Sequence, residues 1–328
     1  MTFIEMLKQK ANQNPKIVVL PESDADTDGV IGEASARVEA DGTARLIRLT
    51  GQMMQECGKR DELAESYAAM RGKGKNLGLR AMQNPIAFGC MMVKCGYAHG
   101  MVAGRYSKSG DVMKFANAII GEQPGRISSV IFFREPPETY PVFKLLACAD
   151  MVVHESPTAE EICRIIVTSA ETFESFTGVE PRIALLSYVT GEPTSIQLNA
   201  DPEMRKTMEA LSMYREAGHR WTVHLSQGDA ALRPDAARIK KAPFADRPAD
   251  LLIGSYLGLS NPVYKLLQDL IVGGNSMFVT QGLNFPVMDL SRSDTASNIE
   301  NVINACCVSA QAFEAKGSYA GIDEFFLN

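Results

Sequence analysis

Short apolar runs, each preceded by a stretch with helical spacing, recur along the whole chain. Continuous apolar runs are typical of strands covered by helices on both faces, and therefore of parallel sheets. Asp and Gly precede several of these runs, as in Ala40-Asp41-Gly42 and Ala149-Asp150, where they suit tight helix-to-strand turns. The pattern predicts an α/β fold of the doubly wound kind. The runs are 17–20, 44–49, 100–103, 127–133, 151–153, 182–186, 251–253 and 276–279.

The length of the chain predicts two domains with a cleft between them, because 328 residues exceed what one hydrophobic core usually serves. Helical periodicity is clear over residues 158–176 and 298–313, and the first 14 residues have the pattern of an amphipathic helix. The Pro-rich segment 134–141 is the candidate crossover. We expect residues 1–145 plus 297–328 to form the first domain, to which the last helix returns, and residues 146–296 to form the second.

Composition excludes several classes of protein. The 39 acidic residues outnumber the 33 Lys and Arg, and no basic run reaches five residues, so a nucleic-acid groove is not expected. Every apolar run ends well short of the ~18 residues that span a bilayer, and the first helix lacks the apolar centre of a signal peptide. Seven cysteines, an odd number lying mostly in apolar runs, predict buried thiols in a reducing compartment. We therefore expect a cytoplasmic protein with no membrane partner.

Motifs for metals and nucleotides are missing from the sequence. No cluster of His, Cys and carboxylates has the spacing of metal ligands, so no metal site is predicted. The segment Gly72-Lys73-Gly74-Lys75 has neither the P-loop nor the dinucleotide-binding spacing, so neither ATP nor NAD is indicated.

The segment 281–292, Gln-Gly-Leu-Asn-Phe-Pro-Val-Met-Asp-Leu-Ser-Arg, lies between a predicted strand and the last long helix. That is where a ligand-binding loop belongs in an α/β fold. The Ser291 hydroxyl could donate to a developing oxyanion while the Arg292 guanidinium holds a phosphate through two parallel hydrogen bonds. A capped helix start followed by a surface arginine is the alternative that these residues leave open.

The same segment resembles the hallmark of the phosphate acetyltransferase and phosphate butyryltransferase family, through Gln281-Gly282-Leu283, Pro286 and Asp289-Leu290-Ser291-Arg292. The resemblance implies reversible transfer of an acetyl or similar short acyl group between acyl phosphate and coenzyme A, by direct thiol attack in an interdomain cleft. It also implies a fold like that of the isocitrate and isopropylmalate dehydrogenases. Similar blocks follow one another over nearly the whole chain: 19–22, 88–93, 102–104, 149–160, 181–188, 227–231, 241–243 and 261–265.

The resemblance also implies partners. Coenzyme A, acyl phosphate and phosphate would be small-molecule substrates, no cofactor would be tightly bound, and the protein would be a homodimer.

Site residues carry over from the family position by position. Ser291 and Arg292 match the family's catalytic serine and arginine, and Arg71 resembles an arginine contributed from the opposite domain. Lys108 lies in a Gly-flanked polar loop that could bind phosphate, with a solvated lysine as the alternative. The expected substrate-binding residues are Gly104, Ser107, Lys108, Ser109, Lys114 and Ser187.

Departures from the family pattern lie near the predicted site. Asn298 stands where the family has its aspartate base, and an amide cannot accept the thiol proton. Asp294 is a candidate replacement; alternatively, Asn298 orients coenzyme A and the thiol ionises unaided. Lys114 replaces an arginine and Ser107 a histidine, while Val223-His224 replaces an Asp-Gly pair.

Two further interpretations stay open. A family member that has lost its base could bind acyl-CoA as a sensor or scaffold. A decarboxylating dehydrogenase would share the expected fold, but it needs a metal-binding aspartate cluster and a nucleotide pocket, neither of which is evident here.

Overall fold

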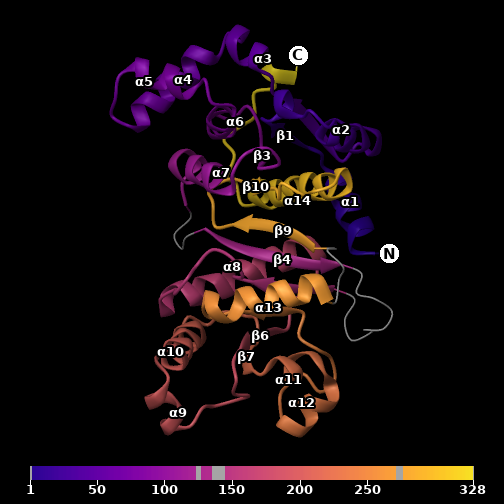
Figure 1. Ribbon diagram of the computed structural model, residues 1–328, viewed down its shortest axis with the longest axis vertical. Helices are drawn as coiled ribbons and strands as arrows, with labels where there is room; N and C mark the ends of the chain where they lie inside the picture. Colours follow the sequence, from indigo (N-terminus) through magenta and orange to yellow (C-terminus); the bar gives the residue numbers. More distant parts are fainter. Residues whose placement is uncertain (1, 123–126, 135–144, 271–275, 328) are drawn as a thin grey trace. The chain divides into compact units, whose positions relative to one another are not determined.

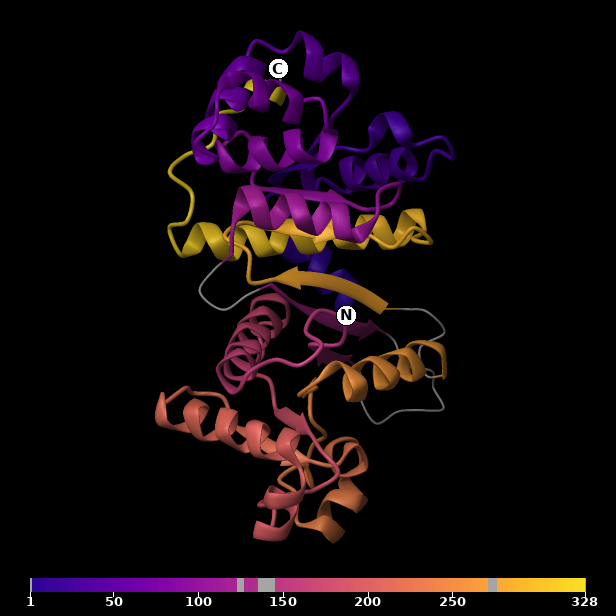
Figure 2. The same cartoon turned by 60° about the vertical axis from the view of Figure 1, so that its left-hand side comes forward.

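The computed structural model describes residues 2–122, 127–134, 145–270 and 276–327. The chain forms two compact units, which are described separately. The first unit comprises residues 3–123 and 283–328, and the second comprises residues 124–282. Each unit is a sheet with helices packed against it (Figures 1 and 2).

The first unit is built on four parallel strands in the order β10-β3-β1-β2. The strands are β1 (Lys16–Leu20), β2 (Ala44–Arg48), β3 (Gly100–Ala103) and β10 (Val287–Asp289). The helices are α1 (Phe3–Gln13), α2 (Val30–Asp41), α3 (Gly51–Glu56), α4 (Arg60–Met70), α5 (Lys75–Ala81), α6 (Pro85–Lys94), α7 (Ser109–Phe115) and α14 (Ala296–Ala315). Shorter helical turns are η1 (Ser23–Ala25), η2 (Ala116–Ile120) and η3 (Phe325–Leu327).

Helices cover both faces of this sheet. Successive residues of a strand point to opposite faces, and β3 shows what each face meets. Gly100 faces α14, because a Cβ atom on Gly100 would lie 2.5 Å from Cys306 Sγ. The next residue, Met101, faces α6, because a Cβ atom on Gly89 of that helix would lie 2.7 Å from Met101 Sδ. Helices α14 and α6 therefore lie on opposite faces, which confirms the doubly wound α/β class for this unit.

The second unit has six strands in the order β7-β6-β8-β5-β4-β9. The strands are β4 (Ser128–Arg134), β5 (Leu145–Ala149), β6 (Ile183–Leu186), β7 (Val223–Ser226), β8 (Leu251–Ile253) and β9 (Ser276–Gln281). The helices are α8 (Ala159–Thr177), α9 (Ser195–Ala200), α10 (Pro202–Glu216), α11 (Gly228–Leu232), α12 (Pro234–Lys240) and α13 (Leu257–Leu270). The predicted helix at 158–176 is confirmed, and Thr158 and Glu161 form a capping box at its start.

Alternation along β4 shows that the second sheet is also covered on both faces. Phe132 stacks on Phe173 and Phe176 of α8, with ring centroids 6.1 and 5.3 Å apart. Phe133, its neighbour in the strand, meets Tyr264 of α13 at 6.3 Å and belongs to the apolar cluster on the other face. The alternation buries both sides of the strand, as its continuous apolar run predicts.

Two expectations about the second sheet are wrong. Strand β4 pairs antiparallel with both β5 and β9 rather than parallel. Ten residues separate β4 from β5, fewer than the dozen or more that a parallel crossover requires. The strand expected at 151–153 lies instead at Leu145–Ala149. Asp150 ends it, and its carboxylate accepts the amides of Val152, Val153 and His154 at 3.0 to 3.4 Å, bending the chain away from the sheet.

The boundaries of the two units also differ from the expected ranges in two segments. Residues 283–296 belong to the first unit, because β10 pairs with β3 of the first sheet. Residues 124–145 belong to the second unit, because β4 pairs with β5 and β9. Strand pairing therefore sets the boundaries of the two units, which the amino-acid composition does not indicate.

Close packing of α5 on α4 yields a stability prediction. A Cβ on Gly78 would lie 1.9 Å from the Ala64 carbonyl oxygen, so Gly78→Ala should lower the free energy of unfolding by about 1–3 kcal/mol, despite the better helix propensity of alanine. Gly110 of α7 has open space around it, so Gly110→Ala should leave stability equal or raise it by up to about 1 kcal/mol. Urea titration followed by circular dichroism measures both. Equal stability of Gly78→Ala and the wild type would contradict this packing.

Candidate active site

The carboxyl ends of β1, β3 and β10 lie at the same edge of the first sheet because the strands are parallel. Glu22, two residues after β1, is only 4% exposed. Its carboxylate accepts the backbone amides of Gly104 at 2.8 Å, Arg105 at 2.9 Å and Tyr106 at 3.3 Å. These bonds satisfy a buried charge and hold the loop after β3 in place.

Gly104 lets the loops after β3 and β10 approach closely. Its φ is +112°, and a Cβ there would lie 2.4 Å from Asp289 Oδ1 and 2.8 Å from both the nitrogen and the oxygen of Leu290. The Leu290 amide donates to the Ala103 carbonyl at 2.7 Å. Because Gly104 has no side chain, the loop that carries Ser291 can lie beside the loop that carries Ser107.

Arg105 and Tyr106 link the loop after β3 to two neighbouring segments. The Arg105 guanidinium donates to the Arg292 carbonyl and pairs with Asp28 at 2.9 Å. The Tyr106 hydroxyl donates to Asp26 at 3.0 Å and also contacts Asp28. The hydrogen bond from Tyr106 lowers the pKa of Asp28. Burial is the main cause that raises the pKa of Tyr106, and the hydrogen bonds to the carboxylates of Asp28 and Asp26 raise it too. Arg105 thus has a structural role, because it ties the loop after β3 to Asp28 and to the backbone carbonyl of Arg292.

The loop of Ser291 is held from within. Asp294 accepts the Ser291 amide at 2.7 Å and the Asn298 side-chain amide at 3.3 Å, so its carboxylate ties the loop to α14. The Ser291 hydroxyl lies 2.9 Å from that of Ser293. Thr295, not Ser291, caps α14 through the Asn298 amide at 3.3 Å. The side chains of Ser291 and Arg292 are consequently left exposed at the edge of the site.

Asp289 is the most unusual carboxyl group here. Its Oδ1 atom is buried and has no hydrogen-bond partner among the described residues. The pKa of Asp289 is raised to about 6, mainly by burial and less by the charges of Glu22 and Asp294, while a hydrogen bond from Ser109 opposes the shift. This carboxyl group therefore changes protonation close to neutral pH.

Several of the predicted site residues meet at this edge, and others do not. Gly104 and Ser107 lie on the loop after β3, and Ser109 begins α7; Gly104 and Ser109 both approach Asp289 at the end of β10. Lys108, just before α7, and Lys114, within it, are exposed, and neither forms an ion pair in the described part of the chain. Ser187 lies at the carboxyl end of β6 in the second unit, where its hydroxyl accepts the Val189 amide at 3.0 Å.

The expected position of Arg71 requires a correction. Arg71 was expected to come from the domain opposite to Ser291 and Arg292, but all three belong to the first unit. Because β10 pairs with β3, the Ser291 loop follows a strand of the first sheet, in the same unit as α4 and α5. Arg71 itself ends α4, exposed, with its guanidinium 5.8 Å from the ring centroid of Tyr67. Within the described residues it forms no hydrogen bond or ion pair with Ser291 or Arg292.

Sequence reasoning missed four residues that organise the site: Glu22, Arg105, Tyr106 and Asp289. Glu22 and Asp289 stand in motifs that resemble the family, yet neither received a role. Arg105 and Tyr106 stand between Gly104 and Ser107, both of which were singled out. Their position directly after a predicted strand was the available signal.

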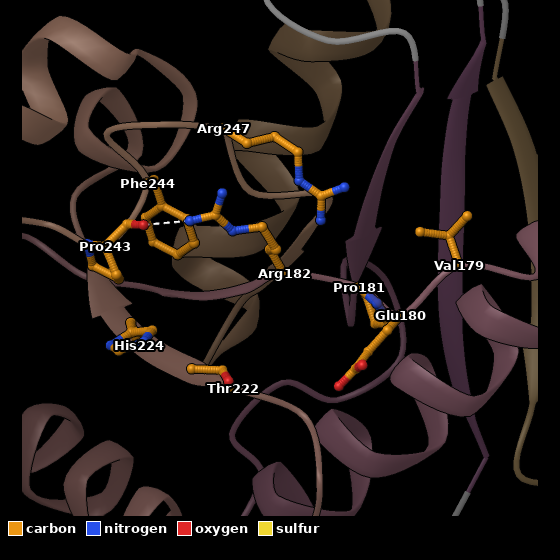
Figure 3. A pocket seen from close by; sticks show the side chains of 9 residues that line it. All are labelled: Val179, Glu180, Pro181, Arg182, Thr222, His224, Pro243, Phe244 and Arg247. Carbon is orange, nitrogen blue, oxygen red and sulfur yellow. Dashed lines mark hydrogen bonds between the residues drawn. The ribbon is translucent and has the colours of Figure 1, made fainter.

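A cavity of about 470 Å³ in the second unit lies at the opposite, amino end of β6 and β7 (Figure 3). Arg182 lies over the Phe244 ring, donates to the Pro243 carbonyl and pairs with Asp246 at 3.0 Å. His224 meets Phe244 edge-on at 6.0 Å, and burial lowers its pKa, as do Arg215 and Arg182. The other arginine that lines the cavity, Arg247, pairs with Asp250 at 2.9 Å. Because both arginines are already paired and ligands in α/β folds bind at carboxyl strand ends, this cavity is not the candidate site.

Among residues 2–122, 127–134, 145–270 and 276–327, no group of three or more His, Cys, Asp or Glu is arranged to hold a metal ion. In the same ranges, the helices are too short or too polar to cross a membrane.

The chain is similar to known proteins over nearly its whole length. Residues 2–307 match the family model described as phosphate acetyl/butaryl transferase. A phosphate acetyltransferase of Thermoanaerobacterium thermosaccharolyticum is 33% identical over 334 residues, which cover 95% of this chain and 100% of that protein. One from Acetivibrio thermocellus is 29% identical, covering 96% of this chain and 100% of the relative.

A solved structure matches as well. The crystal structure of a phosphotransacetylase from Streptococcus pyogenes superposes with a TM-score of 0.81 at 27% identity, covering 94% of this chain and 98% of that one. The chain therefore belongs to the phosphate acetyl/butaryl transferase family of enzymes.

The raised pKa of Asp289 predicts a pH-dependent stability. A carboxyl group whose pKa rises from 3.8 to about 6 on folding stabilises the protein below pH 4 and loses that contribution as the pH rises through 6. Relative to Asp289→Asn, the wild type should therefore gain up to roughly 3 kcal/mol in unfolding free energy as the pH falls from 7 to 4. Urea titrations of both proteins across this range measure the difference. A difference that does not vary with pH would show that Asp289 has an ordinary pKa.

Proposed function

We propose that the protein is a phosphotransacylase that reversibly transfers an acetyl or similar short acyl group between acyl phosphate and coenzyme A. The observation that carries the proposal is the exposed pair of Ser291 and Arg292 on a loop braced by Asp294 and Arg105. A hydroxyl donor and a guanidinium on adjacent residues suit an acyl phosphate, in which a carbonyl and a phosphate are joined. Family membership supports the same reaction class.

In the proposed mechanism the thiolate of coenzyme A attacks the acyl carbon, forming a carbon–sulfur bond and a tetrahedral oxyanion. The Ser291 hydroxyl donates a hydrogen bond to this oxyanion. The carbon–oxygen bond to phosphate then breaks, and Arg292 holds the departing phosphate bidentately without changing its own protonation. Arg71 and Lys114 would add positive charge for the phosphate groups. The products are acyl-CoA and inorganic phosphate.

Asp294 is the proposed acceptor of the thiol proton. Its carboxylate already accepts two hydrogen bonds, from the Ser291 amide and from Asn298, and a carboxylate has capacity for further ones. A free thiol near pKa 8.5 is only a few per cent ionised at neutral pH, so a nearby base increases the reactive fraction. The alternative mechanism leaves the thiol to ionise unaided while Asn298 orients coenzyme A.

The reaction itself is tested by mixing the purified protein with coenzyme A and acetyl, propionyl or butyryl phosphate and following thioester absorbance. We expect thioester from at least one donor, with release of one phosphate per thioester. No thioester from any of the three donors, in a protein that still binds coenzyme A by calorimetry, would favour an acyl-CoA sensor or scaffold. That function is consistent with Asn298, which stands where the family has its aspartate base.

Ser291→Ala should lower kcat about 10²–10³-fold while the dissociation constant for coenzyme A stays nearly unchanged, because the oxyanion forms only in the transition state. Ser293→Ala is the matched control, since it removes a neighbouring exposed hydroxyl from the same loop. The control should lose less than about tenfold in steady-state assays. Equal losses in the two variants would remove the oxyanion role from Ser291.

Asp294→Asn should lower kcat about 10²-fold or more and abolish the acid limb of the pH–rate profile, if the carboxylate takes the thiol proton. Asn298→Ala removes the hydrogen bond to Asp294 but leaves the carboxylate, so its acid limb should remain. Calorimetry should show coenzyme A binding in both variants. Turnover of Asp294→Asn at the wild-type rate would favour the mechanism in which the thiol ionises unaided.

A further inference from the structure

A second cavity, of about 450 Å³, lies in the first unit between α3, the start of α4 and the end of α5. It contains none of the residues of the 289–298 loop. The helix α4 has 11 residues, so about 16 Å of helix separates Arg60, at the cavity, from the end that carries Arg71. The residues that line it are Gly51, Met54, Gln55, Arg60, Met82 and Gln83.

Arg60 has no partner within the part of the chain that the structure describes. Its side chain is half-buried, and its Nε atom is fully enclosed without a hydrogen-bond acceptor. No carboxylate forms an ion pair with it among the described residues. A guanidinium is charged at every physiological pH and carries only donors, so an enclosed Nε–H group without an acceptor is costly. The described residues supply no acceptor for this donor.

The acidic residues of α4 do not fill this role, because lysines have already paired with them. Glu62 pairs with Lys59 at 3.0 Å. Lys75 pairs with Asp61 at 2.7 Å and with Glu65 at 2.9 Å. Acids are thus abundant on the same helix, yet each faces a lysine rather than Arg60. None of these acids therefore supplies an acceptor to Arg60.

The other walls indicate what accompanies the anion. Met82 is fully buried and Met54 half-buried, so the interior wall is apolar and made of adaptable side chains. Gln55 and Gln83 are exposed, and neither side-chain amide forms a hydrogen bond in the described ranges. The Gly51 amide is not available to a ligand, because it donates to Asp24 at 2.6 Å. One cation, two free amides and an apolar wall suit a small amphiphilic anion.

We propose that this cavity is a second ligand site, which binds a short alkyl chain carrying one oxoacid headgroup, a carboxylate or a phosphate monoester. The headgroup pairs with Arg60, and the chain lies against Met54 and Met82. The volume is within the range of small-molecule sites. This inference does not depend on acyl transfer, since binding is measured without turnover.

Isothermal titration calorimetry of the full chain with hexanoate, hexyl phosphate, 1-hexanol and inorganic phosphate tests the site. We expect saturable binding of at least one anion, weakened about tenfold or more in Arg60→Met, which removes the charge but keeps an apolar side chain of similar length. Gln83→Glu, at an exposed position that preserves the fold, should weaken binding as well, by placing a competing carboxylate at the cavity. The tighter of the two anions identifies the headgroup.

Two variants locate the binding. Arg80→Met removes the same charge from an exposed position of α5 outside the cavity and should bind like the wild type. Arg292→Met should retain the Arg60-dependent binding of hexanoate, because Arg292 lies in the other site.

Three results would overturn the proposal. The first is the absence of saturable binding by either anion, or equal affinity in Arg60→Met. The second is binding of 1-hexanol as tight as that of hexanoate, or of inorganic phosphate as tight as that of hexyl phosphate. The third is loss of binding in Arg292→Met instead of Arg60→Met.

Discussion

The buried carboxylate of Glu22 is the interaction on which the arrangement of the site depends. It accepts hydrogen bonds from three consecutive backbone amides of the loop after β3. These bonds offset the cost of burying the negative charge of Glu22. The bonds keep Gly104 in a backbone conformation with positive φ, and the missing side chain admits Asp289 and Leu290. Strands that are far apart in the sequence thereby present their loops at one edge of the sheet.

Negative charge dominates this edge, yet the proposed substrates are anions. The conflict is reduced because the carboxylates accept hydrogen bonds from the protein: Glu22 from backbone amides, Asp28 from Tyr106 and Arg105, and Asp294 from the Ser291 amide. Burial also raises the pKa of Asp289 to about 6, so part of its population is neutral near pH 6. Arg105 supports the loop, while the guanidinium of Arg292 is exposed and available to phosphate.

Family motifs combine residues that face a ligand with residues that hold the fold. Gln281 begins the motif that ends at Arg292, but it is 6% exposed, and its amide bonds Ser128 at 3.0 Å, Ser169 at 2.7 Å and Thr172 at 2.9 Å. It therefore fastens β9 to β4 and α8. The helices at 1–14, 158–176 and 298–313 and most buried strands were predictable, because apolar spacing reflects burial directly. The antiparallel direction of β4 was not, since an apolar run has the same appearance in either direction.

By itself the sequence determined the α/β class, the long helices, the family and the pair Ser291-Arg292, because apolar periodicity and a contiguous motif are local properties. Only the tertiary structure decided that Arg71 belongs to the same unit as that pair, that Glu22 and Asp289 organise the site, and that Arg60 lacks a partner. Each of these depends on which strands pair and which charges meet. Hydrogen bonds and ion pairs between residues far apart in the chain leave no periodic trace in the sequence, so they become visible only once the chain has folded.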